Sequence, residues 1–221
     1  MVAIVKPVCL VIGAGAGIGG TVGRKFAREG YHAALCRRSD AAGLAAMSRS
    51  FEDEGLSVGG YLTNAAEPGA LEQLVSDVEQ VGPIDTMVYN LGAQIGNRSL
   101  EKTSLKTFEL GWQIACFGLF RLAKVLVPLM AARGKGTLLV TSATSAMRGN
   151  AGQHSHAAAM AGRRLLCQTL NAEYASQGIH VAHIVVDGAV DAPDTLGKML
   201  GEEAFAALRN TRGKEHDGLL L

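Results

Sequence analysis

The clearest place for chemistry in this 221-residue chain is a glycine cluster near its N-terminus. The apolar run Val8–Ile12 leads directly into it, and an amphipathic segment with Val22 and Phe26 at helical spacing follows. A strand, a glycine turn and a helix together present free backbone N–H groups at the positive end of a helix, where a pyrophosphate can bind. Any strand-to-helix turn favours glycine, but this context favours a nucleotide. We therefore predict a dinucleotide-binding turn made by Gly13, Ala16, Gly17, Ile18 and Gly19.

Two arginines, Arg37 and Arg38, follow the next apolar segment, residues 31–36. In a dinucleotide-binding fold this strand end meets the adenosine ribose, where a carboxylate would bind a free 2′-hydroxyl. Guanidinium groups instead offer a fork for a 2′-phosphate. We therefore predict that the cofactor is NADP(H) rather than NAD(H). The alternative is that both arginines are a solvated strand end.

Polar residues also follow two later apolar segments. Asn90 and Gly92 come after residues 84–89, where a side-chain amide and a close backbone approach could serve the cofactor. Ser142 and Thr144 lie in a hydroxyl-rich run that could donate hydrogen bonds to a substrate oxygen or could only cap a helix. His156 could donate a proton because imidazole titrates near neutral pH. The alternative for His156 is a partly buried helix histidine.

Alternating strands and helices must position these groups. Apolar runs predict strands at residues 8–12, 31–36, 56–62, 84–89, 137–140 and 179–186, and helices follow the strands, including 104–130, 153–177 and 194–209. The 104–130 helix carries one apolar stripe formed by Phe108, Trp112, Ala115, Leu119, Leu122 and Leu126. Six alternations predict an α/β fold: a doubly wound parallel sheet (Rossmann fold) in a single domain over residues 1–221.

Composition argues against several other classes. The formal net charge is +1, so nothing indicates a nucleic-acid partner or a membrane surface. No apolar run reaches about 18 residues without a charge, and we expect no membrane span. The four cysteines are far apart within apolar runs, which indicates reduced core thiols of a cytoplasmic protein and no metal site.

The whole chain resembles the short-chain dehydrogenase/reductase family, nicotinamide enzymes on a Rossmann fold. The Gly13-xxx-Gly17-Ile18-Gly19 spacing matches that family's glycine motif, and Asn90-Leu91-Gly92-Ala93 is similar to its Asn-Asn-Ala-Gly turn. The resemblance implies that Asn64 touches adenine, that Arg37 lies where NADP-preferring members carry a base, and that Gly188 and Val190 contact the cofactor. It also implies a homodimer or homotetramer. Members usually continue through one more strand, so the sheet is expected to lack its last strand unless the chain is truncated.

The second half keeps the family framework but departs from its chemistry. Such enzymes use a Ser, a Tyr-xxx-Lys pair and an Asn. Matching the segments around Arg148-Gly149 and Ala157-Ala158 without gaps places His156 at the Tyr, Met160 at the Lys and Ala143 at the Ser. Working back from Gly118 places Ala115 at the Asn. Because Met160 carries no charge, it can neither lower a neighbour's pKa nor bind ribose hydroxyls strongly.

These observations predict an NADP(H)-binding protein, an oxidoreductase by family, with an atypical or inactive catalytic site. Its remaining polar candidates for catalysis are His156, Ser142 and Thr144, and its small-molecule substrate is not identified by the sequence. The alternative is a non-catalytic dinucleotide-binding sensor or a scaffold subunit. A third reading is a reductase whose chemistry has moved to His156 with Ser142 or Thr144.

Overall fold

The computed structural model describes residues 5–92, 99–190, 197, 201–211 and 219–220. Six parallel strands form one sheet in the order β3-β2-β1-β4-β5-β6, which confirms the predicted doubly wound fold. The strands are β1 (Val8–Ile12), β2 (His32–Arg37), β3 (Val58–Leu62), β4 (Ile84–Tyr89), β5 (Gly136–Ala143) and β6 (Ile179–Val186). The strand order reverses between β1 and β4, and ligands of such sheets bind beside that switch point, at the carboxyl ends of the strands.

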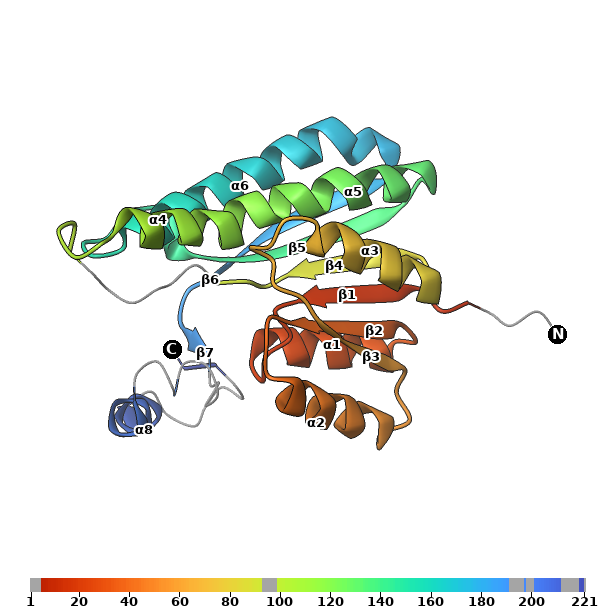
Figure 1. The fold of residues 1–221 in the computed structure, drawn as a ribbon, viewed down its shortest axis with the longest axis horizontal. Helices are drawn as coiled ribbons and strands as arrows, with labels where there is room; N and C mark the ends of the chain where they lie inside the picture. Colours follow the sequence, from red (N-terminus) through yellow and green to blue (C-terminus); the bar gives the residue numbers. More distant parts are fainter. Residues whose placement is uncertain (1–4, 93–98, 191–196, 198–200, 212–218, 221) are drawn as a thin grey trace.

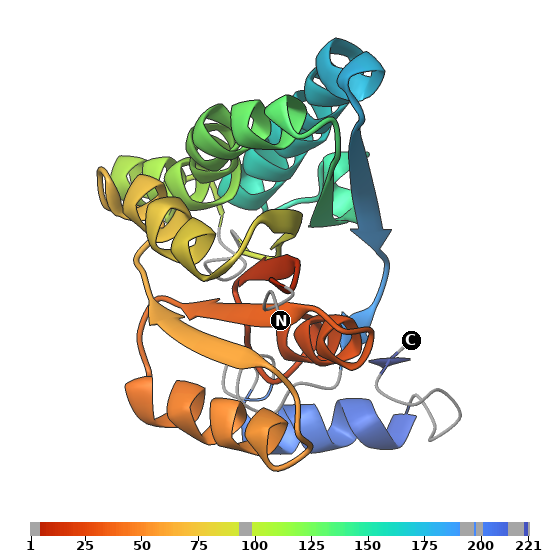
Figure 2. The ribbon, with the colours of Figure 1, turned by 90° about the vertical axis from the view of Figure 1, so that its right-hand side faces the viewer.

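Helices cover both faces of this sheet (Figure 1). α1 (Ile18–Arg28) and α2 (Ala41–Glu52) lie on one face, while α3 (Ala70–Val81), α5 (Gly118–Ala132) and α6 (His154–Tyr174) lie on the other, as Figure 2 shows from a second side. Each face has its own core, and the five residues of β1 are buried between the two. Burial on both faces explains why β1 is an unbroken apolar run rather than an alternating one.

Shorter elements connect and extend this framework. α4 (Leu105–Trp112) precedes α5, and 3₁₀ turns lie at Thr144–Ala146 and Ala175–Gln177. β7 (Ala189–Val190) and β8 (Leu219–Leu220) pair antiparallel, and with α8 (Glu202–Thr211) they lie beyond the carboxyl ends of the strands (Figure 1). The start of the helix predicted at 194–209 lies outside the described residues, and so does Ala93, the last residue of the predicted turn.

The helix predicted at residues 104–130 contains a feature that the sequence pattern missed. A π-helical segment, Gln113–Phe117, separates α4 from α5. Phe108 and Trp112 are 42% and 41% exposed, whereas Leu119, Leu122 and Leu126 are fully buried. The expected continuous stripe is therefore wrong at its start, because one extra residue in a turn rotates the preceding residues by about 100°.

The stretch Leu105–Ala132 is 28 residues long, and it is the only described helix long and apolar enough to span a membrane by length and composition. Half of its most apolar window is buried within the domain, and its buried side chains pack on the sheet. A buried core helix passes the same test of length and composition.

Candidate cofactor and catalytic site

The backbone of the turn between β1 and α1 lies close to the residues that follow β4. Gly13 has a φ of +89°, and a Cβ there would lie 2.8 Å from the carbonyl oxygen of Asn90. A Cβ on Gly19 would overlap the carbonyl oxygen of Gly13, so this glycine lets α1 start directly against the turn. α1 begins after Gly17 without a side-chain cap, and the N–H groups of its first turn have no intrahelical acceptor.

A cavity of about 290 Å³ lies beside this turn at the carboxyl ends of β1, β2 and β4. Five predicted cofactor residues line it, namely Gly13, Arg37, Arg38, Asn64 and Gly92. Ala16, Gly17, Ile18 and Gly19 continue from Gly13 into α1 without lining it, and Gly188 and Val190 lie after β6 and do not line it either. The sequence reasoning missed Cys36, Thr63, Leu91 and Ile114. Cys36 is the penultimate residue of β2, Thr63 directly follows β3, and Leu91 is the second residue after β4.

The two arginines at the end of β2 differ in their surroundings. The Nε of Arg37 donates to the carbonyl oxygen of Ala14 at 2.7 Å, and its Nη1 donates to Asp40 at 2.8 Å. Asp40 itself has a left-handed φ of 69° and accepts from the amide of Gly43 at the start of α2. The sequence reasoning missed this carboxylate because it follows the strand by three residues. Arg38 is exposed, and no hydrogen bond or ion pair joins its side chain to another described residue.

The two predicted asparagines hold the backbone of the cavity wall. The Nδ2 of Asn90 donates to the Gly13 carbonyl at 3.1 Å, and its Oδ1 accepts from Thr141 at 2.8 Å, which ties β1, β4 and β5 together. Asn64 donates to Glu67 at 2.9 Å and accepts from the amide of Ala66 at 3.2 Å. Both side chains shape the turns that border the cavity.

The structure places the three catalytic candidates near one end of β5. Ser142 belongs to β5, which is longer than predicted, and its Oγ lies 3.6 Å from the Sδ of Met160. Thr144 opens the following 3₁₀ turn. His156 lies in the first turn of α6, where its buried Nδ1 has no hydrogen-bond partner among the described residues. Burial lowers the pKa of His156, and the positive charge of Arg163 lowers it further.

An apolar cluster lies beside these polar groups. Met160, four residues after His156 on the same face of α6, is 1% exposed. It packs with Ala115, Ala146 and Ala159 into a small buried cluster. The structure thus brings together positions 115 and 160, which the sequence aligned with an Asn and a Lys, and both positions are apolar in this chain.

A buried arginine, Arg163, is a site residue that the sequence reasoning missed. Its guanidinium donates from Nε to the carbonyl of Ala115 at 2.8 Å, from Nη1 to that of Thr141 at 2.7 Å and from Nη2 to that of Leu91 at 2.6 Å. These contacts tie α6 to the π-helix, to β5 and to the turn after β4. The sequence did contain a feature that could have identified it: an arginine seven residues after His156, on the predicted helix face that bears Met160.

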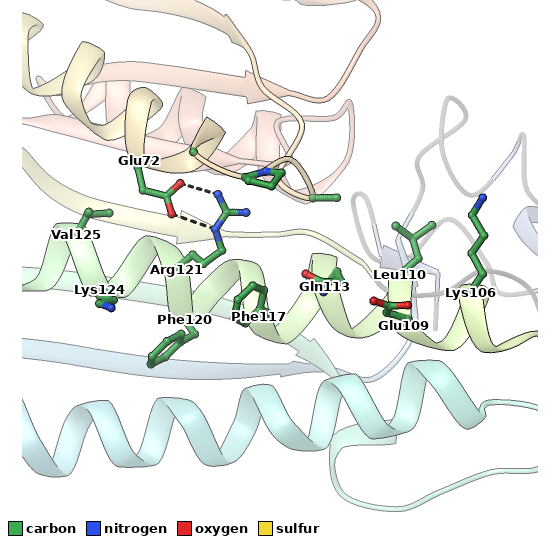
Figure 3. A pocket seen from close by; sticks show the side chains of 13 residues that line it. Glu72, Lys106, Glu109, Leu110, Gln113, Phe117, Phe120, Arg121, Lys124 and Val125 are labelled. Carbon is green, nitrogen blue, oxygen red and sulfur yellow. Dashed lines mark hydrogen bonds and ion pairs between the residues drawn. The ribbon is translucent and has the colours of Figure 1, made fainter.

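A larger groove, of about 930 Å³, lies on the outer helical layer rather than at the sheet edge. Its walls come from the start of α3 and from α4, the π-helix and α5 (Figure 3). Among the residues that line it, Arg121 donates two hydrogen bonds of 3.0 and 2.6 Å to Glu72, and Phe117 and Phe120 contribute apolar surface. This groove contains neither the glycine turn nor the strand ends at which the sequence predicts the dinucleotide, and the smaller cavity contains both.

Residues 7–198 match the model of the short chain dehydrogenase family, so the chain belongs to that family. It is 31% identical over 200 residues to a glycine betaine reductase of Emericella nidulans, covering 90% of this chain and 15% of that protein. It is 29% identical over 191 residues to a 3-oxoacyl-acyl-carrier-protein reductase of Thermotoga maritima, covering 85% of this chain and 76% of that protein.

The fold also matches solved structures. A gluconate 5-dehydrogenase from Burkholderia cenocepacia, solved with NADP and tartrate, superposes with a TM-score of 0.77 at 23% identity. The match covers 86% of this chain and 74% of that one. At this identity the likeness establishes the Rossmann-type fold that the strand order already defines.

Proposed function

We propose that this protein binds NADP(H) across the cavity at the β1–β4 switch point, with an altered catalytic centre that does not perform the usual carbonyl reduction of its family. The observation that carries the second half of this proposal is the apolar cluster around Met160. The first half rests on the glycine turn, the cavity beside it and Arg38 on its wall, whose side chain has no hydrogen bond or ion pair to another residue that the structure describes.

The residues present fit a dinucleotide. The close approach at Gly13 and Gly19 brings the turn against the N-terminal end of α1, which would face a pyrophosphate, and Leu91 and Gly92 also line the cavity. Arg38 would meet a 2′-phosphate, while Arg37 is already held by Asp40. The bound cofactor would supply or accept a hydride, and the chain itself would have to deliver a proton to the substrate oxygen.

We predict that the protein binds NADPH more tightly than NADH by about ten- to hundredfold, since a charge-assisted contact to phosphate contributes roughly 1.5–3 kcal/mol. Arg38→Ala should remove most of this difference by weakening NADPH binding alone. Isothermal titration of both cofactors against wild type and variant measures it. Equal dissociation constants for the two cofactors in the wild type would contradict the prediction.

A change at Asp40 tests the other arginine, Arg37, in the opposite direction. Asp40→Asn keeps the oxygen that caps α2 and tolerates the left-handed backbone, but it removes the charge that holds Arg37. NADPH binding should then tighten while NADH binding changes little, because Arg37 becomes available to the phosphate. Unchanged NADPH affinity in Asp40→Asn would mean that Arg37 does not face the phosphate.

His156 is poorly suited to replace the missing acid. The lowered pKa keeps its imidazole neutral at neutral pH, and a neutral imidazole is a weak proton donor. Ser142 faces the sulfur of Met160 rather than a base. These two observations favour a second candidate, a non-catalytic dinucleotide sensor or scaffold subunit, over a reductase whose chemistry has moved to His156.

We also propose that the protein is a homodimer or homotetramer through its α4–α5 and α6 face. This face exposes an unusual number of large apolar side chains, which would be covered in an assembly. They are Leu105, Phe108, Leu110, Trp112, Phe117, Phe120, Leu129 and Leu165.

Light scattering at micromolar concentration should therefore give a mass of at least twice the 23.0 kDa of the chain. Phe120→Glu should lower this mass by placing a charge in the middle of the face, whereas Val81→Glu, an exposed apolar position on α3, should leave it unchanged. A monomeric wild type would rule the assembly out.

A further inference from the structure

Arg163 is the least expected group in the fold. Its side chain is only 1% exposed, and among the described residues no Asp or Glu forms an ion pair with it. Buried charges in proteins are normally paired, because removing an ion from water is costly. Here the guanidinium is held by three backbone carbonyls, and it lies 5.2 Å from the centre of the Tyr89 ring.

The titratable groups around Arg163 do not neutralise its charge. They are Tyr89, Cys116, Cys167, His156 and His183. Burial raises the pKa of the phenol and of both thiols, to about 12 for Cys167, so these groups carry no negative charge at neutral pH. Burial lowers the pKa of both histidines, so they stay uncharged as well. A net positive charge therefore remains inside the protein.

The contacts of Arg163 place this charge next to the cavity wall. Leu91, whose carbonyl accepts from Nη2, lines the cavity, and so does Ile114, the neighbour of Ala115 in the π-helix. A dinucleotide with its adenosine end at Arg38 continues past Gly13 and Leu91 toward β5. The third acceptor of Arg163, Thr141, belongs to β5. The nicotinamide half would thus lie on the side of the site where Arg163 is buried.

We propose that Arg163 makes the site discriminate between the redox forms of its cofactor, favouring reduced NADPH over NADP⁺. The inference rests on the proposed NADP(H) function and deepens it. The two forms carry the same phosphates and differ in the ring, which is positively charged only when oxidised. A like charge in a partly desolvated site opposes the oxidised ring. At an effective dielectric constant of about 20, two unit charges roughly 10 Å apart repel each other by about tenfold in affinity.

The test measures the ratio of the NADP⁺ and NADPH dissociation constants by titration calorimetry. The wild type should bind NADPH at least about tenfold more tightly than NADP⁺. Arg163→Met should bring the ratio close to one, and Arg163→Lys, which keeps the charge but cannot reach all three carbonyls, should retain most of it. Arg164→Met removes a charge from the adjacent position and should leave the ratio as in the wild type.

The ratio separates an electrostatic role from a structural one. If Arg163 only fastens the backbone, its loss weakens both forms equally and the ratio persists, which overturns the inference. A wild-type ratio of one or below overturns it without any variant, so the test stands even if Arg163→Met does not fold by circular dichroism. If the wild type binds neither form, the proposed function itself fails; binding without discrimination leaves that function standing and defeats only this inference.

Discussion

With saturating NADPH, the purified protein should reduce activated ketones at well below about 1 s⁻¹, the lower end of ordinary enzyme turnover. Hydride transfer requires a proton, or electrostatic stabilisation, at the developing alkoxide, and a general acid typically contributes about 100- to 10,000-fold. In this chain Met160 and Ala115 form an apolar cluster, Ser142 faces a sulfur atom, and His156 is neutral. Spectrophotometric NADPH oxidation over a panel of carbonyl compounds measures the rate.

A gain-of-function variant tests the same prediction from the other side, by restoring the four polar residues that the family uses for catalysis. The quadruple variant Ala115→Asn, Ala143→Ser, His156→Tyr and Met160→Lys should gain measurable turnover. Because Arg163 lies one helical turn from position 160 and already binds the carbonyl of residue 115, the new lysine would face a like charge. The gain should therefore be larger when Arg163→Met is added to the four changes.

Two outcomes would change the assignment. Wild-type turnover of about 1 s⁻¹ or faster would show that the protein is catalytic, and loss of that turnover in His156→Ala would identify His156 as the acid. If neither the quadruple variant nor its combination with Arg163→Met shows turnover while NADPH is bound, the alignment of residues 143–160 is misplaced or the substrate cannot enter.

Gly178→Ala should destabilise the domain by about 2–4 kcal/mol, the sum of a left-handed backbone penalty and a steric overlap. Gly178 has a φ of +80° where α6 turns into β6, and an added Cβ would overlap the carbonyl oxygen of Gly134 and lie 2.7 Å from its carbon. Both turns belong to the β5–β6 pair, so neither can move without shifting a strand. The midpoint of thermal unfolding should fall by on the order of 10 °C.

Gly55→Ala is the matched control. Gly55 has a φ of +71°, but no atom lies within 4 Å of an added Cβ. It should cost only the backbone penalty, about 1–2 kcal/mol. Equal destabilisation of the two variants would show that the turn at Gly134 yields to the new methyl group.

The sheet could be predicted from the sequence because each strand is specified locally. The residues of β1 and of most of β4 are buried on both faces, and such strands appear as apolar runs with glycine or asparagine at their ends. The glycine turn was predictable for the same reason, since the strand, the turn and the helix are adjacent in the chain.

The site was less predictable because its key contacts join distant segments. Arg163 and Leu91 are 72 residues apart, and no local pattern relates them. The pairing of Arg37 with Asp40 is close in sequence but depends on the left-handed backbone of Asp40, which is unusual for a residue other than glycine. The π-helix was missed because an apolar sequence is compatible with both α-helical and π-helical geometry, and the choice depends on tertiary contacts that the sequence does not show.

The π-helix also has a consequence for what positions the two halves of the helical stretch Leu105–Ala132. Tyr89 donates to the carbonyl of Ile114, and Arg163 donates to that of Ala115. Two buried side chains therefore fix the backbone of the π-helix. On the C-terminal side, α5 is packed into the main core, whereas the only buried residue of α4 is Gly111. α4 is held by α6 instead: the hydroxyl of Ser155 donates to the carbonyl oxygens of Thr107 and Phe108, and the ring of Trp112 lies against Gly162. The orientation of α4 therefore follows α6, whereas the orientation of α5 follows the main core, and the π-helix is the joint between them.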